Sequence, residues 1–281
     1  MLLTRLITAL VLVGLLLTAL AQSSPWPFAL LTLLLIAAAA WEWGRLNQAG
    51  RTPSLMFGAA VLFVGVAALL GPWAATAPPV LWWVAVVLWL VGGSLALRSG
   101  PAAWPRLPRA GRWLLGLLCL LAGWLALANA RAVGVNFVLS ALCLVWAADV
   151  AAYFGGRRFG RRKLAPSISP GKTWEGVWSG MLGVMLLAAV WLLIDQRFAV
   201  DSASLYTRLH ASLGWAGMVL ALALLAAFSV AGDLVESLVK RSAGAKDSSR
   251  LLPGHGGVLD RVDALLPVLP LALALNSLNL A

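Results

Sequence analysis

The run LALLAAFSVAGDLVESLVKRS (Leu222–Ser242) changes from mostly apolar residues to a charged segment without any proline between the two. Its charged end has polar residues at spacings of zero, three, four, seven and eight, which places them on one face of an α-helix. An acid near the end of a membrane helix costs a few kcal/mol unless it is paired or solvated, so this face predicts a functional site. The face consists of Asp233, Glu236, Ser237, Lys240 and Arg241.

The chain as a whole is strongly apolar. Of its 281 residues 62% are hydrophobic and 11% are charged, whereas a soluble domain is roughly 25% charged. A hydrocarbon core about 30 Å thick needs roughly 20 apolar residues per helix. Helices pair their backbone polar groups internally, so we expect an all-α integral membrane protein, a polytopic bundle of about nine transmembrane helices. The apolar runs are approximately residues 4–21, 27–44, 54–71, 79–97, 112–130, 133–153, 176–194, 213–236 and 263–280.

The basic residues are distributed unevenly over the connections. Eighteen of the 21 Lys and Arg residues lie at the N-terminus or in every second connection, and the opposite connections hold only Arg131, Arg197 and Arg208. Basic residues that flank membrane helices stay in the cytoplasm, which predicts a cytoplasmic N-terminus and, after nine crossings, a C-terminus outside. This distribution accounts for the net charge of +11 without nucleic acid as a partner.

The first run allows two interpretations. It follows Arg5 and ends in Ala19-Leu20-Ala21, which resembles a signal-peptidase site, but it is also long enough to remain as an anchor. The later topology is the same in both cases. Cys119 and Cys143 lie inside apolar runs and are interpreted as packing residues.

The chain divides into two parts of different chemical character. Residues 1–130, with five predicted helices, carry short connections, and Glu42 near a helix end receives no role. Residues 131–281, with four predicted helices, contain two cytoplasmic loops, about 154–175 and 237–262, which hold 11 of the 18 inside-facing basic residues. We expect these two loops to form a polar site at the membrane surface.

Ordinary helix pairing competes with a functional interpretation of the polar face. Glu236 can pair with Lys240 one turn later, and Asp233 can face Ser237. The pairing is as good an explanation as function for Glu236. No cation stands three or four residues after Asp233, so Asp233 is the stronger functional candidate.

The segment after this face, SAGAKDSSRLLPGHGGVLDRVDALL (Ser242–Leu266), is rich in glycine around His255. Glycines there let backbone N–H groups approach a ligand closely. Asp260 and Asp263 stand three residues apart, on one side of the next helix. Asp263 fits a helix N-cap as well as a ligand, whereas Asp260 precedes the apolar run and is a functional candidate. Carboxylates beside phosphate-binding groups suit Mg²⁺.

The earlier loop is basic and follows Asp149 and Tyr153, which are one helical turn apart. Topology alone explains most of its charge. The GKT triplet (Gly171–Thr173) is not a P-loop, because Pro166 stands where that motif requires glycine and no strand precedes it. Lys172 and Thr173 still lie just before a helix N-terminus, a setting that favours phosphate.

Together these groups suit phosphoryl or nucleotidyl transfer better than acyl transfer. They offer many cations, plausible metal-binding acids and no activated Ser or Cys nucleophile. Such transfer needs mainly charge neutralisation and alignment. The two substrates would come from different phases, one from water and one from the lipid.

These residues resemble the phosphatidate cytidylyltransferase family, also called CDP-diacylglycerol synthases. The resemblance covers about residues 145–265 closely, including DVAAYFGGRRFGRRKLAPSISPGKTWEG in the earlier loop. The C-terminal family pattern is met by Ser237, Lys240, Arg241, Lys246, Asp247, Pro253, His255, Gly256, Gly257, Asp260, Arg261 and Asp263.

The resemblance implies that CTP and phosphatidate react to give CDP-diacylglycerol and pyrophosphate with Mg²⁺, with K⁺ as a possible second cation. It implies a homodimer in a bacterial inner membrane, with the active site facing the cytoplasm, and Asp233 and Asp260 as metal ligands. The other implied catalytic residues are Ser237, Lys240, Arg241, Lys246, Asp247, His255, Arg261 and Asp263. The substrate-binding set is Tyr153, Lys172, Thr173, Lys240, Arg241, Gly256 and Gly257.

Two other functions stay open at this point. A CTP-dependent lipid kinase would also need a metal and basic loops, but it would release CDP instead of pyrophosphate. A transporter of an anionic phosphorylated solute would need polar residues near the bilayer midplane on several helices. The acids singled out above lie at predicted cytoplasmic helix ends instead.

Overall fold

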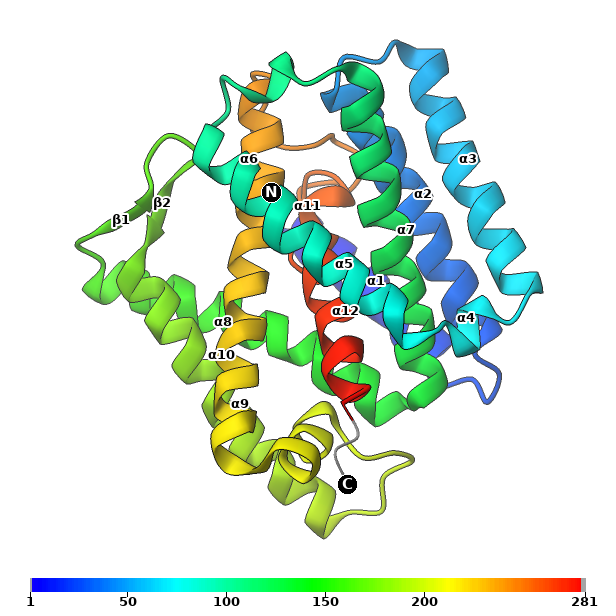
Figure 1. The fold of residues 1–281 in the computed structure, drawn as a ribbon, viewed down its shortest axis with the longest axis vertical. Coiled ribbons are helices and arrows are strands. Elements are labelled where there is room, and N and C mark those ends of the chain that lie inside the picture. The colour runs from blue at the N-terminus through cyan, green and yellow to red at the C-terminus, as the bar shows by residue number, and fades with distance from the viewer. Residues whose placement is uncertain (1, 279–281) are drawn as a thin grey trace.

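The computed structural model describes residues 2–278, with side chains from residue 7 onward, and is mainly helical (Figure 1). Its only β-sheet within that range is a two-stranded antiparallel hairpin. The first half contains α1 (Leu2–Leu20), α2 (Trp26–Leu46), α3 (Arg51–Leu70), α4 (Trp73–Thr76), α5 (Pro79–Leu88), the π-helix η1 (Trp89–Gly93), α6 (Ser94–Ser99), the 3₁₀ helix η2 (Trp104–Arg106) and α7 (Arg109–Val133). The second half contains α8 (Val135–Phe159), β1 (Lys163–Ala165), β2 (Ser169–Thr173), α9 (Trp174–Arg197), α10 (Leu205–Ser242), α11 (Leu259–Val262) and α12 (Leu265–Asn276).

Seven helical segments within residues 2–278 are long and apolar enough to cross a membrane. They are α2, α3, the continuous stretch from α5 through α6, α7, α8, α9 and α10. The first apolar run forms a shorter apolar helix over Ile7–Leu20, and the last forms α12, which has 12 residues. An all-α membrane protein is therefore confirmed, whereas nine crossings and the sides of the two termini stay predictions.

The outer surface of the bundle is apolar. Phe63 and Leu70 are each 76% exposed, and many other large hydrophobic side chains are exposed in the same way. A soluble monomer rarely exposes contiguous apolar patches of more than a few hundred Å². Lipid is the solvent that suits this surface.

Helix α12 occupies the middle of the bundle, beside α5, α7 and α10 (Figure 1). Ten of its residues are buried, as expected for a helix that is apolar on all sides. Gly232 of α10 lets the two helices approach, because a Cβ there would stand 2.5 Å from the Asp263 carbonyl oxygen. This close packing fixes α11 and the connection between α10 and α11, residues 243–258, against the end of α10. We call this connection the glycine-rich segment.

Helices α8 and α9 pack as an antiparallel pair through small residues. A Cβ on Gly180 would stand 2.9 Å from the Ala148 carbonyl oxygen, and one on Gly176 would stand 3.0 Å from that of Ala152. Small residues of this kind let membrane helices approach closely. The pair forms one wall of the cavity described below.

The earlier cytoplasmic loop differs from the prediction. Helix α8 continues to Phe159, and the hairpin of β1 and β2 follows it, so residues 154–175 are not the irregular connection that was expected. The statement that no strand precedes the GKT triplet is wrong, because β1 precedes it and the triplet lies in β2. Pro166 still excludes a P-loop. The polar face was predicted correctly as helical, because α10 continues to Ser242. Helix α10 also begins at Leu205, earlier than residue 213, with a bend at Gly214, whose φ is 67°.

Candidate active site

A polar cavity of about 540 Å³ lies between α8, α9, α10 and the hairpin. Its volume falls in the roughly 300–1,000 Å³ range of small-molecule sites. The cavity therefore brings the end of α8, the GKT triplet and the polar face of α10 together. Its ionisable and hydroxyl-bearing lining residues are Asp149, Tyr153, Arg157, Ser169, Lys172, Thr173 and Asp233.

Asp233 and Lys172 join the two predicted loops. The Lys172 Nζ atom lies 2.6 Å from Asp233 Oδ2, and the Ser237 hydroxyl donates to Asp233 Oδ1 at 3.2 Å. The side chains of Lys172 and Asp233 are 26% and 32% exposed, so the pair remains accessible from the cavity. No cation follows Asp233 one turn later on its own helix. Lys172 of β2, about 60 residues earlier in the chain, supplies the positive charge instead.

Asp149 is a second carboxylate in the same cavity. It lies in the second half of α8 and lines the cavity together with Lys172 and Asp233. The sequence placed it beside Tyr153 but assigned it no role. Tyr153 also lines the cavity, where its hydroxyl accepts a hydrogen bond from Arg157 at 3.3 Å.

Lys240 lies between two carboxylates. Its Nζ atom is 2.5 Å from Glu236 Oε2 and 2.6 Å from Asp260 Oδ1. The helical pair of Glu236 with Lys240 is confirmed. Asp260 adds a partner from α11, so Lys240 ties the end of α10 to the segment that follows it.

Asp260 also holds the glycine-rich turn. Its Oδ2 atom accepts from the Ser248 N–H at 3.0 Å, the Ser248 hydroxyl at 2.8 Å and the Gly257 N–H at 2.8 Å. Burial tends to raise the pKa of Asp260, but the hydrogen bonds from Lys240 and the backbone lower it to about 2. Asp260 is therefore ionised near neutral pH. Gly256 has a φ of 85°, and a Cβ there would stand 2.8 Å from Asp260 Oδ2.

Glu42 is the residue that sequence reasoning missed. It lies on α2 in the first half of the chain and is completely buried. Its Oε1 atom accepts from the Ser249 hydroxyl at 2.5 Å and the Val258 N–H at 3.0 Å. Its Oε2 atom accepts from the Leu259 N–H at 2.7 Å and lies 3.1 Å from the Ser248 hydroxyl, whose single proton it shares with Asp260. A residue from the first half of the chain thus holds the glycine-rich segment in place.

His255 and Arg261 lie together at the edge of this segment. Arg261 Nη2 donates to the His255 carbonyl oxygen at 2.7 Å, and Arg261 is otherwise exposed. The His255 Nδ1 atom is buried and has no hydrogen-bond partner among the described residues. Neither side chain lines the polar cavity.

The other predicted residues have more varied surroundings. Arg241 donates to the Ile168 carbonyl oxygen at 3.3 Å and so fastens the hairpin to α10. Thr173 is the N-cap of α9, where its hydroxyl accepts from the Gly176 N–H at 3.2 Å. Lys246 and Asp247 are exposed in the segment after α10 and do not line the polar cavity.

Gly257 and Asp263 are in contact with neighbouring residues of the protein and do not line the polar cavity. A Cβ on Gly257 would stand 2.0 Å from the Ser248 hydroxyl and 2.4 Å from Glu42 Oε1, so only glycine fits. The N-cap interpretation of Asp263 is wrong, because a short helix, α11, forms first and Ala264 occupies the N-cap position of α12. Asp263 Oδ1 instead accepts from the Ala264 N–H at 2.8 Å.

The donor set of the cavity fits a cation that is bound jointly with phosphate. No three His, Cys, Asp or Glu side chains in the described part of the chain form a group that could hold a metal on their own. Mg²⁺ commonly uses one or two carboxylates and completes its shell with water and substrate phosphates. Asp149 and Asp233 provide two carboxylates in one cavity, in which Lys172 is paired with Asp233 and Arg157 also lines the wall.

Comparison with known proteins agrees with this chemistry. A phosphatidate cytidylyltransferase of Pseudomonas aeruginosa is 38% identical over 286 residues, which cover 98% of this chain and 97% of the relative. One of Brucella suis is 38% identical over 93% of this chain and 88% of the relative. One of Haemophilus influenzae is 44% identical over a shorter region, 49% of this chain and 44% of the relative. The cytidylyltransferase family profile matches residues 3–278, so the chain belongs to the cytidylyltransferase family.

Proposed function

We propose that this protein transfers the cytidylyl group of CTP to phosphatidate and produces CDP-diacylglycerol and pyrophosphate. The observation that carries the proposal is the Lys172–Asp233 pair, which joins two basic segments in one polar cavity at the end of an apolar bundle. Such a position serves one water-soluble and one lipid substrate. The names of the full-length relatives support the same reaction.

The transfer is a direct in-line displacement. An oxygen of the phosphatidate phosphate forms a bond to the α-phosphorus of CTP, while the bond from that phosphorus to the bridging oxygen breaks and pyrophosphate leaves. The second pKa of a phosphate monoester is about 6, so the attacking group is largely ionised at neutral pH and needs no strong general base.

The chain's own residues neutralise and align the phosphates. Lys172 and Arg157 line the cavity, and Arg261 is a further phosphate contact implied by the family resemblance. Fixed cations lower the barrier when they face the charge that develops on the leaving pyrophosphate. Lys240, with both neighbouring carboxylates, keeps Asp260 and the glycine-rich turn in place for these contacts. Lys246 and Arg241 are the further phosphate contacts implied by the family resemblance.

Mg²⁺ is the proposed cofactor, with K⁺ as a second cation, and Asp233 and Asp260 are its proposed ligands. Bound Mg²⁺ supplies positive charge to the triphosphate and the leaving group. Asp233 lines the cavity directly. Asp260 does not line the cavity; its Oδ1 atom is paired with Lys240 and its Oδ2 atom accepts three hydrogen bonds, so a metal bound by Asp260 would replace one of these contacts. Asp149 is the additional carboxylate on the cavity wall.

The proposed setting is a bacterial inner membrane, in which the chain crosses nine times as a homodimer with the cavity facing the cytoplasm. The basic residues support this side of the membrane, because the connections that form the site carry most of them. The bacterial relatives support the kind of organism.

A purified-protein assay with CTP, phosphatidate and Mg²⁺ tests the reaction. We expect equal amounts of pyrophosphate and CDP-diacylglycerol. Release of CDP with a newly phosphorylated lipid would favour the lipid kinase, and absence of both expected products would refute the proposal. No specific observation favours the kinase or the transporter.

A further inference from the structure

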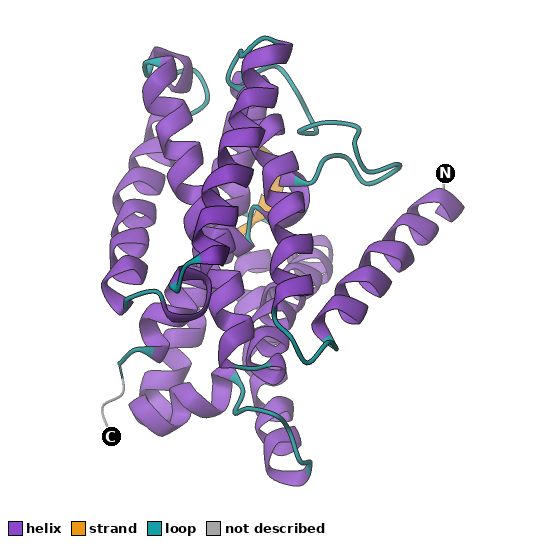
Figure 2. Cartoon of the chain, turned by 90° about the vertical axis from the view of Figure 1, so that its right-hand side faces the viewer, coloured by secondary structure: helices purple, strands orange, loops and turns teal. Residues whose placement is uncertain are grey.

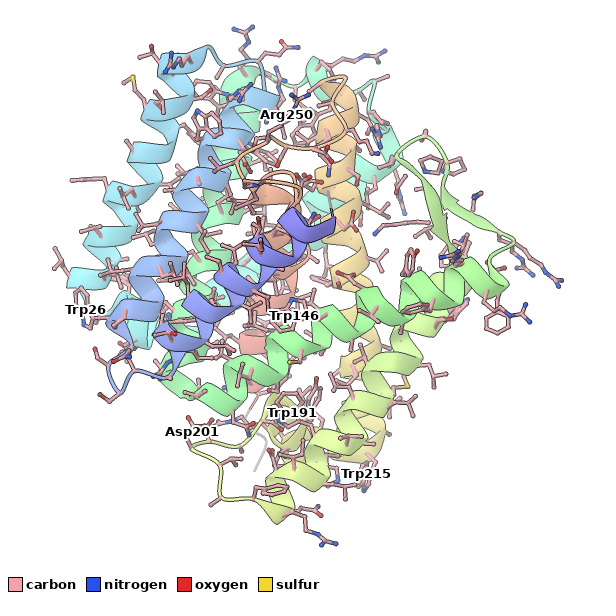
Figure 3. All side chains as sticks on the ribbon, turned by 180° about the vertical axis from the view of Figure 1, so that it is seen from behind. Trp26, Trp146, Trp191, Asp201, Trp215 and Arg250 are labelled. Atoms are coloured by element: carbon pink, nitrogen blue, oxygen red, sulfur yellow. The ribbon has the colours of Figure 1, made fainter. Side chains whose placement is uncertain are left out.

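A second cavity, of about 440 Å³, lies beside the glycine-rich segment, between α1, α2, α7, α8 and α12. We call it the α1 groove. Its walls are apolar and include Leu12, Leu16, Leu127, Trp146 and Leu269. Figure 2 shows α1 leaning away from the other helices, and Figure 3 shows Trp146 of α8 beside it. The groove therefore lies where the apolar bundle would meet lipid.

Among the side chains that the structure describes, from residue 7 onward, His255 and Arg261 are the only ionisable ones that line the α1 groove. The buried His255 Nδ1 atom lacks a hydrogen-bond partner within residues 2–278, although buried polar atoms are nearly always satisfied. Arg261 donates once to the His255 carbonyl oxygen. A guanidinium has five N–H donors, so it can hold a phosphate at the same time.

Arg261 also lies close to the end of α10. It directly follows Asp260, whose Oδ1 atom is 2.6 Å from the Lys240 Nζ atom. A phosphate at Arg261 would therefore lie near the α10 residues that belong to the proposed site. Arg261 itself lines the α1 groove and not the polar cavity.

We infer that the α1 groove holds an acyl chain of the lipid substrate, with the lipid phosphate bound by Arg261 and His255 near the end of α10. The inference rests on the proposed function. A purely apolar occupant would leave His255 Nδ1 unsatisfied, and a nucleotide would leave the apolar walls unfilled. An anionic lipid with a phosphate head satisfies both parts of the site.

The inference can be tested by asking how long an acyl chain the groove accepts. The Thr8 hydroxyl donates to the Pro253 carbonyl oxygen at 3.1 Å, so this part of α1 lies at the headgroup end. Leu16 is eight residues further along the helix, about 12 Å away at 1.5 Å per residue. Leu16→Trp should therefore obstruct a long chain more than a short one. Leu17 lies next to it, is 48% exposed and does not line the groove, so Leu17→Trp is the matched control.

We would measure kcat/KM with dioctanoyl and dipalmitoyl phosphatidate in the same detergent. Leu16→Trp should lower the ratio of dipalmitoyl to dioctanoyl activity roughly tenfold, because apolar sites discriminate by about this much for each methylene that no longer fits. Leu17→Trp should leave the ratio unchanged. An unchanged ratio in Leu16→Trp, or an equal shift in Leu17→Trp, would overturn the inference.

A binding measurement keeps the inference testable without turnover or a variant. Phosphatidate with a diazirine at the end of one acyl chain should label α1, α7 or α8 of the unaltered protein, and dipalmitoyl phosphatidate should compete. Equal competition by phosphatidylcholine would assign the groove to bulk lipid and overturn the inference. If the unaltered protein converts neither phosphatidate, the proposed function fails, while the labelling result still decides the occupant of the groove.

Discussion

Asp260 combines two tasks in one side chain. It pairs with Lys240 and accepts three hydrogen bonds from the glycine-rich segment. Its low pKa follows from these contacts and keeps the carboxylate charged throughout the physiological range. Any change that removes the charge therefore disturbs both the Lys240 pair and the turn that contains His255.

Asp260→Asn removes the charge and places an amide group among N–H and O–H donors. We expect kcat for CDP-diacylglycerol formation to fall by about a hundredfold or more, the effect of losing one preorganised electrostatic contact. The measurement is product formation by protein purified from membranes. Arg250→Gln changes an exposed charge in the same segment and should retain activity. Near-normal turnover of Asp260→Asn would remove Asp260 from the metal site.

Lys172 is expected to contribute mainly to CTP binding. Lys172→Gln should raise the KM for CTP about tenfold, since a hydrogen bond to a charged group is worth about 1.5–3 kcal/mol. Lys163→Gln is the matched control, because Lys163 is in the same hairpin but is exposed and does not line the cavity. A similar rise in KM for both variants would indicate general attraction by the basic segment instead of a specific contact.

Helix α2 connects the first half of the chain to the second through Glu42. Glu42 accepts hydrogen bonds from both ends of the glycine-rich segment, at Ser248 and at Leu259. It has no direct place in the polar cavity. Glu42 is therefore a positioning residue that fixes the segment against the bundle.

Glu42→Gln should loosen this segment without unfolding the helices. The amide nitrogen of glutamine cannot accept, so buried donors are left unpaired at a cost of about 1–3 kcal/mol each. We expect faster hydrogen exchange at the Val258 and Leu259 amides, together with lower kcat. Arg45→Gln, an exposed change on the same helix, should alter neither. Unchanged exchange at Val258 and Leu259 would contradict this role.

The sequence predicted contacts that depend on local spacing and missed those that depend on folding. One helical turn between Glu236 and Lys240 predicted their pair, and the helical form of the segment through Ser242 was predicted correctly. The partners of Glu42 lie 206 and more residues away, so no local pattern indicates them. The hairpin was missed because a five-residue strand such as SPGKT (Ser169–Thr173) has neither alternation nor β-branched enrichment.

The molecule has a polar region at each end of its apolar helical bundle. The glycine-rich segment and the connection between α9 and α10 lie at opposite ends (Figure 1). The second end has its own polar network, in which Asp195 accepts from Asn136 Nδ2 at 2.8 Å and from the Ser204 N–H at 3.0 Å. This network stabilises the connection and the start of α10. The predicted site belongs to the more basic end.

This polarity leads to a topology prediction. The distribution of basic residues predicts that the glycine-rich segment lies in the cytoplasm, and nine predicted crossings would then put the C-terminus outside. A reporter that is active only outside the cytoplasm should be active when fused to the C-terminus or inserted at residues 198–204, and inactive when inserted at residues 100–103. The two insertions serve as internal controls, because they test the opposite ends of the bundle. An inactive C-terminal fusion with both insertions as expected would mean that α12 does not span the membrane and that the C-terminus lies on the cytoplasmic side.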